Sequence, residues 1–261
     1  MTTLYSIFRL IRLDSSILGF LIIFISLLAR TNDLSVSFRR AIPLLFICIC
    51  TFIANDLDDI ETDRVNHPDR PLPTGKITIT FAVLLYFICL ALALFSTKYF
   101  VEQGIDFWYY GLISISISYG YIVDGLPSLK APYVAAIVAI PVLTVAVSYP
   151  NEIQLYVVAT ALFLITFGRE ICMDIKDRDG DVASFIHRLS PKPLAIAAFT
   201  LQATGQLFMA IYIRHQGEVI CLLAMILLLA SSSIYWFRFS KYKQAIILMK
   251  FQFVFGLYFL T

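Results

Sequence analysis

The most regular feature of the chain is a series of long apolar runs separated by short polar connections. A transmembrane helix needs about 20 mostly apolar residues, and nine segments approach that length. The runs are too long for the strands of a lipid-facing barrel, and they lack the alternation of such strands. The pattern therefore predicts nine membrane-spanning helices, at roughly Ser15–Ala29, Ala41–Ala54, Ile77–Thr97, Phe107–Ile122, Ala131–Ser148, Ile153–Gly168, Leu194–Ile213, Val219–Phe237 and Ala245–Leu260.

The composition of the whole chain agrees with a membrane protein. Of its 261 residues, 59% are hydrophobic and 15% are charged, and the mean hydropathy is +0.82. A soluble chain of this length cannot bury so much apolar surface. The net charge of +2 is too balanced for a nucleic-acid partner. Because no segment has the composition of a soluble domain or a long linker, we expect residues 1–261 to form one all-α domain, a single bundle of about nine helices.

The distribution of lysine and arginine predicts the orientation of this bundle. With the N-terminus in the cytosol, 14 of the 20 basic residues fall in cytosolic segments and 5 on the other side, while Lys250 lies inside the ninth span. This bias follows the positive-inside rule. Arg9 and Arg12 before the first apolar run also resemble the start of a signal peptide, but a chain that returns to the membrane so often favours a retained first span.

Acidic residues gather at the ends of the second and sixth spans, which both reach the cytosolic face in this orientation. In a continuous helix, Asp56, Asp59 and Asp63 lie within about 60° of one another. Single acidic residues at helix ends are usually solvated charges, but stacked like charges repel and favour a bound cation. Carboxylates without His or Cys among them suit a hard ion such as Mg²⁺. The second group shares one helix face in the same way: Glu170, Asp174, Asp177 and Asp181.

Basic residues accompany both clusters, and Arg64 and Arg70 follow the first one closely. Arg and Lys neutralise phosphate oxygens while a metal bridges carboxylate to phosphate, so a diphosphate is the ligand that fits this combination. Arg70 opens the stretch RPLPTG, residues 70–75, which predicts a rigid turn that folds a basic loop over a polar site at the cytosolic face. Most of the 22 Phe and 14 Tyr should face lipid or pack, and a few in a pocket would stabilise a carbocation.

The two clusters follow specific patterns. Segment Asn55–Asp63 reads NDxxDxxxD and precedes RPLPTG, while Asp174–Asp181 reads DxxDxxxD. Together they resemble the two aspartate-rich signatures of the UbiA-type intramembrane prenyltransferases. The second is closest to the form in branches that make archaeal-lipid, chlorophyll and tocopherol or quinone intermediates. Arg12–Asp14 and Tyr121–Lys130 match weaker family positions, so the similarity extends over essentially the whole chain.

The resemblance implies an Mg²⁺-dependent enzyme within the bilayer that ionises an allylic prenyl diphosphate and transfers the prenyl group to an aromatic or lipid acceptor. The residues that it implies as metal ligands and catalytic groups are Asp56, Asp59, Asp63, Asp174, Asp177 and Asp181. The residues that it implies for diphosphate binding are Asn55, Arg64, Arg70, Lys130 and Tyr121.

Three departures from the family pattern leave the acceptor open. The segment after Asp181 lacks the usual basic RTLP-like stretch, Asp14 stands where many members carry Asn, and Asp124 lies in a loop without the common Pro-Pro. Some members of the superfamily use no acceptor, so a terpene cyclase on the same scaffold is the alternative. A non-enzymatic transporter or scaffold is disfavoured because nearly all charges lie at the ends of the spans.

Overall fold

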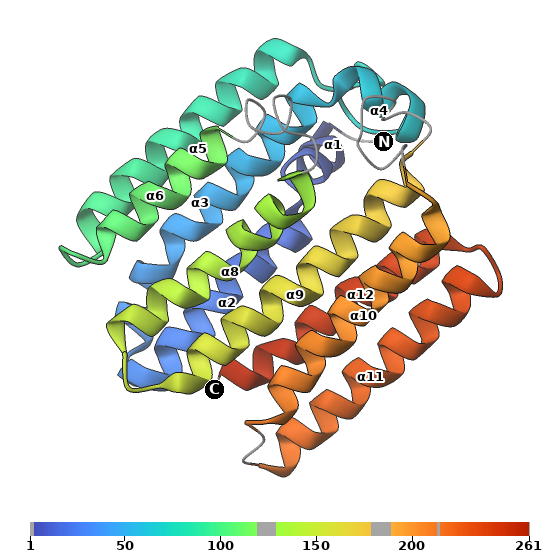
Figure 1. Ribbon diagram of the computed structural model, residues 1–261. Helices are drawn as coiled ribbons and strands as arrows, with labels where there is room; N and C mark the ends of the chain where they lie inside the picture. The colour runs from blue at the N-terminus through green and yellow to red at the C-terminus, as the bar shows by residue number, and fades with distance from the viewer. Residues whose placement is uncertain (1–2, 119–128, 179–188, 213–214, 261) are drawn as a thin grey trace. The chain divides into compact units, whose positions relative to one another are not determined.

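The long apolar runs form α-helices, as the sequence predicts (Figure 1). The computed structural model describes residues 3–118, 129–178, 189–212 and 215–260. Within these ranges every regular element is a helix and none is a strand. The all-α prediction is therefore confirmed for the described residues.

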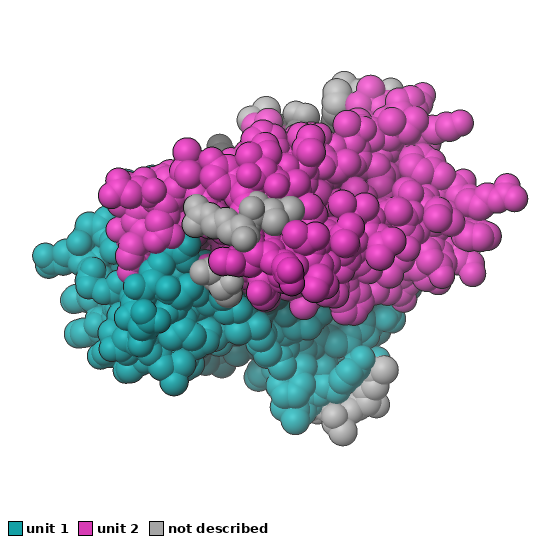
Figure 2. All heavy atoms as spheres, turned by 90° about the horizontal axis from the view of Figure 1, so that it is seen from below, with its two compact units in different colours: residues 1–126 teal, residues 127–261 magenta. Residues whose placement is uncertain are grey.

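The chain divides into two compact units, residues 1–126 and 127–261 (Figure 2). The helices of unit 1 are α1 (Thr3–Leu10), α2 (Leu13–Thr31), α3 (Leu34–Asp58), α4 (Ile60–Asn66), α5 (Ile79–Phe100) and α6 (Asp106–Ile117). The helices of unit 2 are α8 (Lys130–Ser148), α9 (Ile153–Lys176), α10 (Pro191–Ala210), α11 (Gln216–Phe237), α12 (Tyr242–Gly256) and the 3-10 helix η3 (Leu257–Leu260). A single domain over residues 1–261 stays a prediction.

Eight helices in the described ranges are long and apolar enough to cross a membrane, namely α2, α3, α5, α8, α9, α10, α11 and the stretch from α12 through η3. The predicted span Phe107–Ile122 begins in α6, which has 12 residues, and residues 119–128 lie outside the described ranges. The count of nine spans therefore stays a prediction.

Two helices extend well beyond the apolar runs that predicted them. The run Ala41–Ala54 becomes α3, which starts after Asp33, whose carboxylate accepts a hydrogen bond from the Val36 amide at 2.9 Å, and ends at Asp58. The run Ile153–Gly168 becomes α9, which continues to Lys176. Hydropathy underestimates both lengths because a helix continues through charged residues as long as its backbone hydrogen bonds are made. Both acidic segments therefore begin inside helices.

Unit 1 has a hydrophobic cluster that joins the end of α1, the second half of α3, α5 and the RPLPTG loop. Leu10 and Ile53 are fully buried in it, and Leu72 and Ile77 bring the loop into the same cluster. The loop is therefore held against α3 by apolar packing, which fixes its backbone beside the aspartates.

Close approach and buried amides hold the helices of unit 2 together. A Cβ at Gly168 would lie 2.2 Å from the carbonyl oxygen of Ala198, so only glycine allows α9 and α10 to pack this closely. The Gln206 amide donates to Gln252 Oε1 at 2.8 Å and to the Met225 carbonyl at 3.0 Å, which links α10 to α12 and α11. Small residues and interhelical hydrogen bonds of this kind join helices in lipid, where hydrophobic association contributes little.

Candidate functional site

Asp56 lies in the last turn of α3 and is almost completely buried, with 3% of its side chain exposed. Arg12 donates to Asp56 Oδ1 at 2.6 Å, and Arg70 Nη1 lies 3.4 Å from the same oxygen. A buried carboxylate without a partner would cost several kcal/mol. The two guanidinium groups offset that cost and make Asp56 the centre of a charged cluster.

Asp63 is the second buried carboxylate of this cluster and lies in α4. It accepts a hydrogen bond from Arg70 Nη1, the same nitrogen that lies near Asp56. Burial raises the pKa of Asp63, and the attraction of Arg70 lowers it by less. The pKa of Asp63 is therefore raised on balance, and the nearby Asp56 carboxylate raises it further.

Asp59 interrupts the helix that the sequence predicts to run on to Asp63. Its backbone has φ −89° and ψ 11°, so α3 ends at Asp58 and α4 begins at Ile60. The Asn55 amide donates to Asp59 Oδ2 at 2.7 Å. The expectation of three aspartates on one continuous helix face is therefore only partly right. Asp56 and Asp63 share Arg70, whereas Asp59 pairs with Asn55.

The RPLPTG stretch forms the expected turn. The Arg70 carbonyl accepts from the amide of Thr74 at 3.1 Å and from its hydroxyl at 2.8 Å. Gly75 follows with φ +69°, a left-handed conformation that glycine adopts without steric cost. These contacts fix the backbone of Arg70, so its guanidinium reaches both buried carboxylates from a rigid base.

Arg64, which the resemblance implies as a diphosphate ligand, has a different neighbour. It pairs with Glu61 at 2.8 Å, and the two side chains are 61% and 79% exposed. Such an exposed pair contributes little to stability. A role of Arg64 in substrate binding stays a prediction.

Arg12 is the site residue that the sequence predictions left out. It lies between α1 and α2 with φ 42° and ψ 57°, which is strained for a residue other than glycine. Its guanidinium lies 5.1 Å from the centre of the Phe52 ring and contacts Asp56. The match of Arg12–Asp14 to a weak family position was the signal, but the contact joins residues 44 positions apart, which a local pattern cannot show.

In unit 2, Asp174 lies near the end of α9 and is 9% exposed. Lys130, the first residue of α8, places its Nζ 3.5 Å from Asp174 Oδ1. The structure therefore brings together two residues for which the family resemblance implies diphosphate and metal binding, although 44 positions separate them in the chain.

The remaining members of the second cluster continue along α9. Asp177 caps its C-terminus and contacts Lys176, and Glu170 pairs with Arg169 at 2.6 Å. Asp181 and Tyr121 lie outside the described residues, so their predicted roles stay predictions.

The donor atoms of both clusters fit Mg²⁺ chemically, since they are carboxylate and amide oxygens, which hard cations prefer. In the described ranges no three His, Cys, Asp or Glu side chains form a group that holds a metal ion by itself. Mg²⁺ is usually bound by one or two carboxylates together with water and substrate phosphates, so three converging protein ligands are not required.

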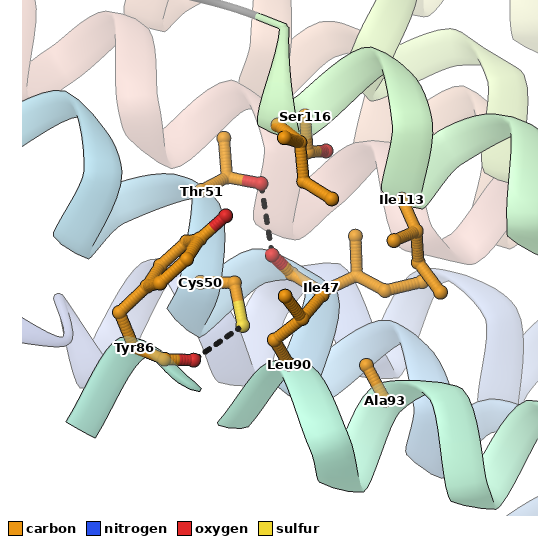
Figure 3. A pocket seen from close by; sticks show the side chains of 9 residues that line it. Ile47, Cys50, Thr51, Tyr86, Leu90, Ala93, Ile113 and Ser116 are labelled. Atoms are coloured by element: carbon orange, nitrogen blue, oxygen red, sulfur yellow. Dashed lines mark hydrogen bonds between the residues drawn. The ribbon is translucent and has the colours of Figure 1, made fainter. Parts of the chain in front are cut away.

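Unit 1 also contains a small, mostly apolar pocket lined by residues of α3, α5 and α6 (Figure 3). Its polar walls include Cys50, whose thiol donates to the Tyr86 carbonyl at 3.6 Å, and Ser116, whose buried hydroxyl has no hydrogen-bond partner among the residues that the structure describes. Cys50 and Thr51 lie more than about 100° around α3 from Asp56. The pocket is therefore separate from the carboxylate cluster.

Comparison with known proteins places the chain in a family. Residues 17–257 match the sequence model of the UbiA prenyltransferase family. The digeranylgeranylglyceryl phosphate synthase of Pyrococcus abyssi is 31% identical over 134 residues, which are 49% of this chain and 46% of that protein. The chain thus aligns with about half the length of the curated relatives it matches.

Solved structures share the fold. The apo structure of a UbiA homolog from Aeropyrum pernix has a TM-score of 0.75 at 16% identity and covers 98% of this chain and 96% of that one. A UbiA homolog from Archaeoglobus fulgidus bound to GPP and Mg²⁺ has a TM-score of 0.63 at 18% identity, covering 98% and 99%. With its many apolar helices, the chain is an integral, multi-pass membrane protein. Since the family match extends over more than nine-tenths of its length, the chain belongs to the UbiA prenyltransferase family.

Proposed function

We propose that this chain is an Mg²⁺-dependent prenyltransferase that ionises an allylic prenyl diphosphate within the membrane and transfers the prenyl group to a lipid acceptor. The observation that carries the proposal is the contact of one guanidinium, that of Arg70, with two buried aspartates of the family's first signature. Such an arrangement offers both charges that a metal diphosphate requires, carboxylates for the metal and a guanidinium for phosphate oxygens.

The aspartates and basic residues have separate tasks in this reaction. Bound Mg²⁺ would neutralise charge on the diphosphate as it leaves, held by Asp56, Asp59 and Asp63 and by Asp174, Asp177 and Asp181. Arg70 and Lys130 bind phosphate oxygens, with Asn55, Arg64 and Tyr121 as further contacts. The bond between the allylic carbon and the diphosphate oxygen breaks, and its electron pair leaves with the diphosphate. The acceptor then supplies the electron pair of the new bond and loses a proton.

The relatives favour a lipid acceptor over an aromatic one. Eight of them carry the name digeranylgeranylglyceryl phosphate synthase. That product has two geranylgeranyl groups on glyceryl phosphate, so we propose geranylgeranyl diphosphate as the donor and a prenylated glyceryl phosphate as the acceptor.

Product analysis separates this transferase from the alternative cyclase. Purified protein is incubated with geranylgeranyl diphosphate and Mg²⁺, with no acceptor, with geranylgeranylglyceryl phosphate, or with an aromatic acceptor. A cation formed in a dry site is captured by an acceptor, by its own double bonds or by water. We expect rapid diphosphate release and a doubly prenylated lipid only with the lipid acceptor. A cyclic hydrocarbon or alcohol formed without any acceptor would establish the cyclase instead.

We further propose that the N-terminus and both aspartate clusters face the cytosol. In a variant without the native cysteines, single cysteines at Thr74 and Ser190 should react with a membrane-impermeant reagent only after cells are opened, because the basic residues favour that side. A cysteine at Asn151, in the turn between α8 and α9, should react in intact cells. Labelling of Thr74→Cys or Ser190→Cys from outside would refute this orientation.

A further inference from the structure

The short helix α1 has two contrasting faces. Leu4, Tyr5 and Phe8 are 58%, 46% and 42% exposed, and at about 100° per residue they fall within one arc of about 100°. Ser6 and Leu10 lie on the opposite side of the helix and are buried. α1 therefore packs one face on unit 1 and presents an apolar face, with an aromatic residue at its border, outward.

The inner side of α1 is connected to the carboxylate cluster through two arginines. Arg9 contacts the carbonyl of Asp69 at 2.9 Å and its carboxylate at 2.8 Å, next to Arg70 in the RPLPTG loop. Arg12, two residues after the end of α1, contacts Asp56. Figure 1 shows α1 at the same end of unit 1 as α4. A shift of α1 would therefore move Arg9 and Arg12, and through Asp69 it would also move the loop that carries Arg70.

The chain itself indicates what covers the outer face of α1. Only Ile11 and Arg12 separate α1 from α2, a membrane-spanning helix whose outward residues near its start include the exposed Ile17. Exposed apolar side chains therefore lie on both sides of the short junction between α1 and this membrane-spanning helix. A helix of eight residues is too short to cross the bilayer.

We infer that α1 is an interfacial membrane helix, whose contact with lipid through Leu4, Tyr5 and Phe8 positions Arg9 and Arg12 at the aspartate site. Aromatic residues such as Tyr5 are enriched at this depth of a membrane. Contact with lipid fixes α1 and so orders the loop that binds the diphosphate. This second step rests on the proposed function, whereas contact of α1 with lipid does not depend on it.

Fluorescence in vesicles tests the lipid contact directly. Trp108 and Trp236, the two native tryptophans, are replaced by Phe, and Phe8→Trp supplies the only indole. The protein is reconstituted in phosphatidylcholine vesicles with bromine either near the headgroups or near the acyl-chain ends. Phe87→Trp, on the outward face in the middle of α5, is the deep control, and Asn151→Trp in a polar turn is the aqueous control.

We expect blue-shifted emission from Phe8→Trp and stronger quenching by the shallow bromines than by the deep ones. Emission at water-exposed wavelengths without quenching would overturn the inference. Blue-shifted emission that no bromine quenches would also overturn it, because another protein surface would then cover α1. Stronger quenching by the deep bromines would show an inserted segment, not an interfacial one.

A second measurement tests the link to the site. Leu4→Ser combined with Phe8→Ser should raise KM for the prenyl diphosphate about 10-fold and leave kcat nearly unchanged, because binding and not chemistry is affected. Ile17→Ser, on the lipid-facing side of α2, is the control and should leave KM unchanged. Unchanged KM in the double variant would refute the link, even if fluorescence shows lipid contact. If no variant turns over any prenyl diphosphate, the proposed function fails and the fluorescence result stands by itself.

Discussion

Asp56→Asn is expected to lower kcat/KM for the prenyl diphosphate by at least about 100-fold, because it removes one charge that offsets the developing charge of the leaving diphosphate. The substitution keeps the shape of the buried side chain but removes the charge that pairs with Arg12 and Arg70, so the melting temperature should fall as well, and activity is compared at a temperature where the variant stays folded. Asp177→Asn should have a comparable effect in the second cluster. Activity of the unchanged protein should disappear with a chelator and return with millimolar Mg²⁺.

Asp58→Asn is the matched control for the first cluster. Asp58 is exposed and lies two residues after Asp56, on another side of α3, so its variant should keep activity within about twofold. Kinetics at several Mg²⁺ concentrations decide the result, since a lost metal ligand also raises the Mg²⁺ concentration needed for half-maximal rate. Turnover of Asp56→Asn close to that of the unchanged protein would remove Asp56 from the site.

The membrane is the reason why so much of the fold follows from the sequence. A chain in lipid satisfies its backbone either within helices or in a closed barrel, so runs such as Ala131–Ser148 determine elements almost residue by residue; α8 spans Lys130–Ser148. Hydropathy alone does not locate the helix ends where the chain leaves the apolar region. At the charged ends of α3 and α9, hydropathy no longer reports whether the helix continues.

In the site as well, the sequence predicts features that depend on local spacing, but it does not predict contacts between side chains. Spacing within Asn55–Asp63 identifies the aspartates as a group, but it does not reveal the irregular backbone at Asp59 or the hydrogen bond that its carboxylate accepts from the Asn55 amide. Arg64 is adjacent to Asp63 in sequence, yet it pairs with Glu61. Arg12 is 44 positions from Asp56 and contacts it, because tertiary packing brings the start of α2 to the end of α3.

Arg70→Ala is expected to impair activity and stability together, since one side chain serves both in the proposed site. Loss of the guanidinium removes the ion pair with the buried Asp63. It also removes one of the two positive charges that offset the burial of the Asp56 carboxylate. Breaking a buried ion pair typically costs about 3 kcal/mol or more, so a clear fall of the melting temperature in detergent is expected. Loss of a phosphate contact should also lower kcat/KM at least about 100-fold.

Mg²⁺ separates these two effects. If Asp56 and Asp63 bind the metal, saturating Mg²⁺ replaces the missing positive charge and should raise the melting temperature of Arg70→Ala toward that of the unchanged protein, by mass action on the folded state. Activity should stay low, because the metal cannot supply the guanidinium that binds phosphate oxygens. Arg39→Ala, at the other end of α3, removes an exposed side chain and should change neither quantity. A melting temperature of Arg70→Ala that does not respond to Mg²⁺ would show that the two aspartates serve as partners of Arg70 and not as ligands of the metal.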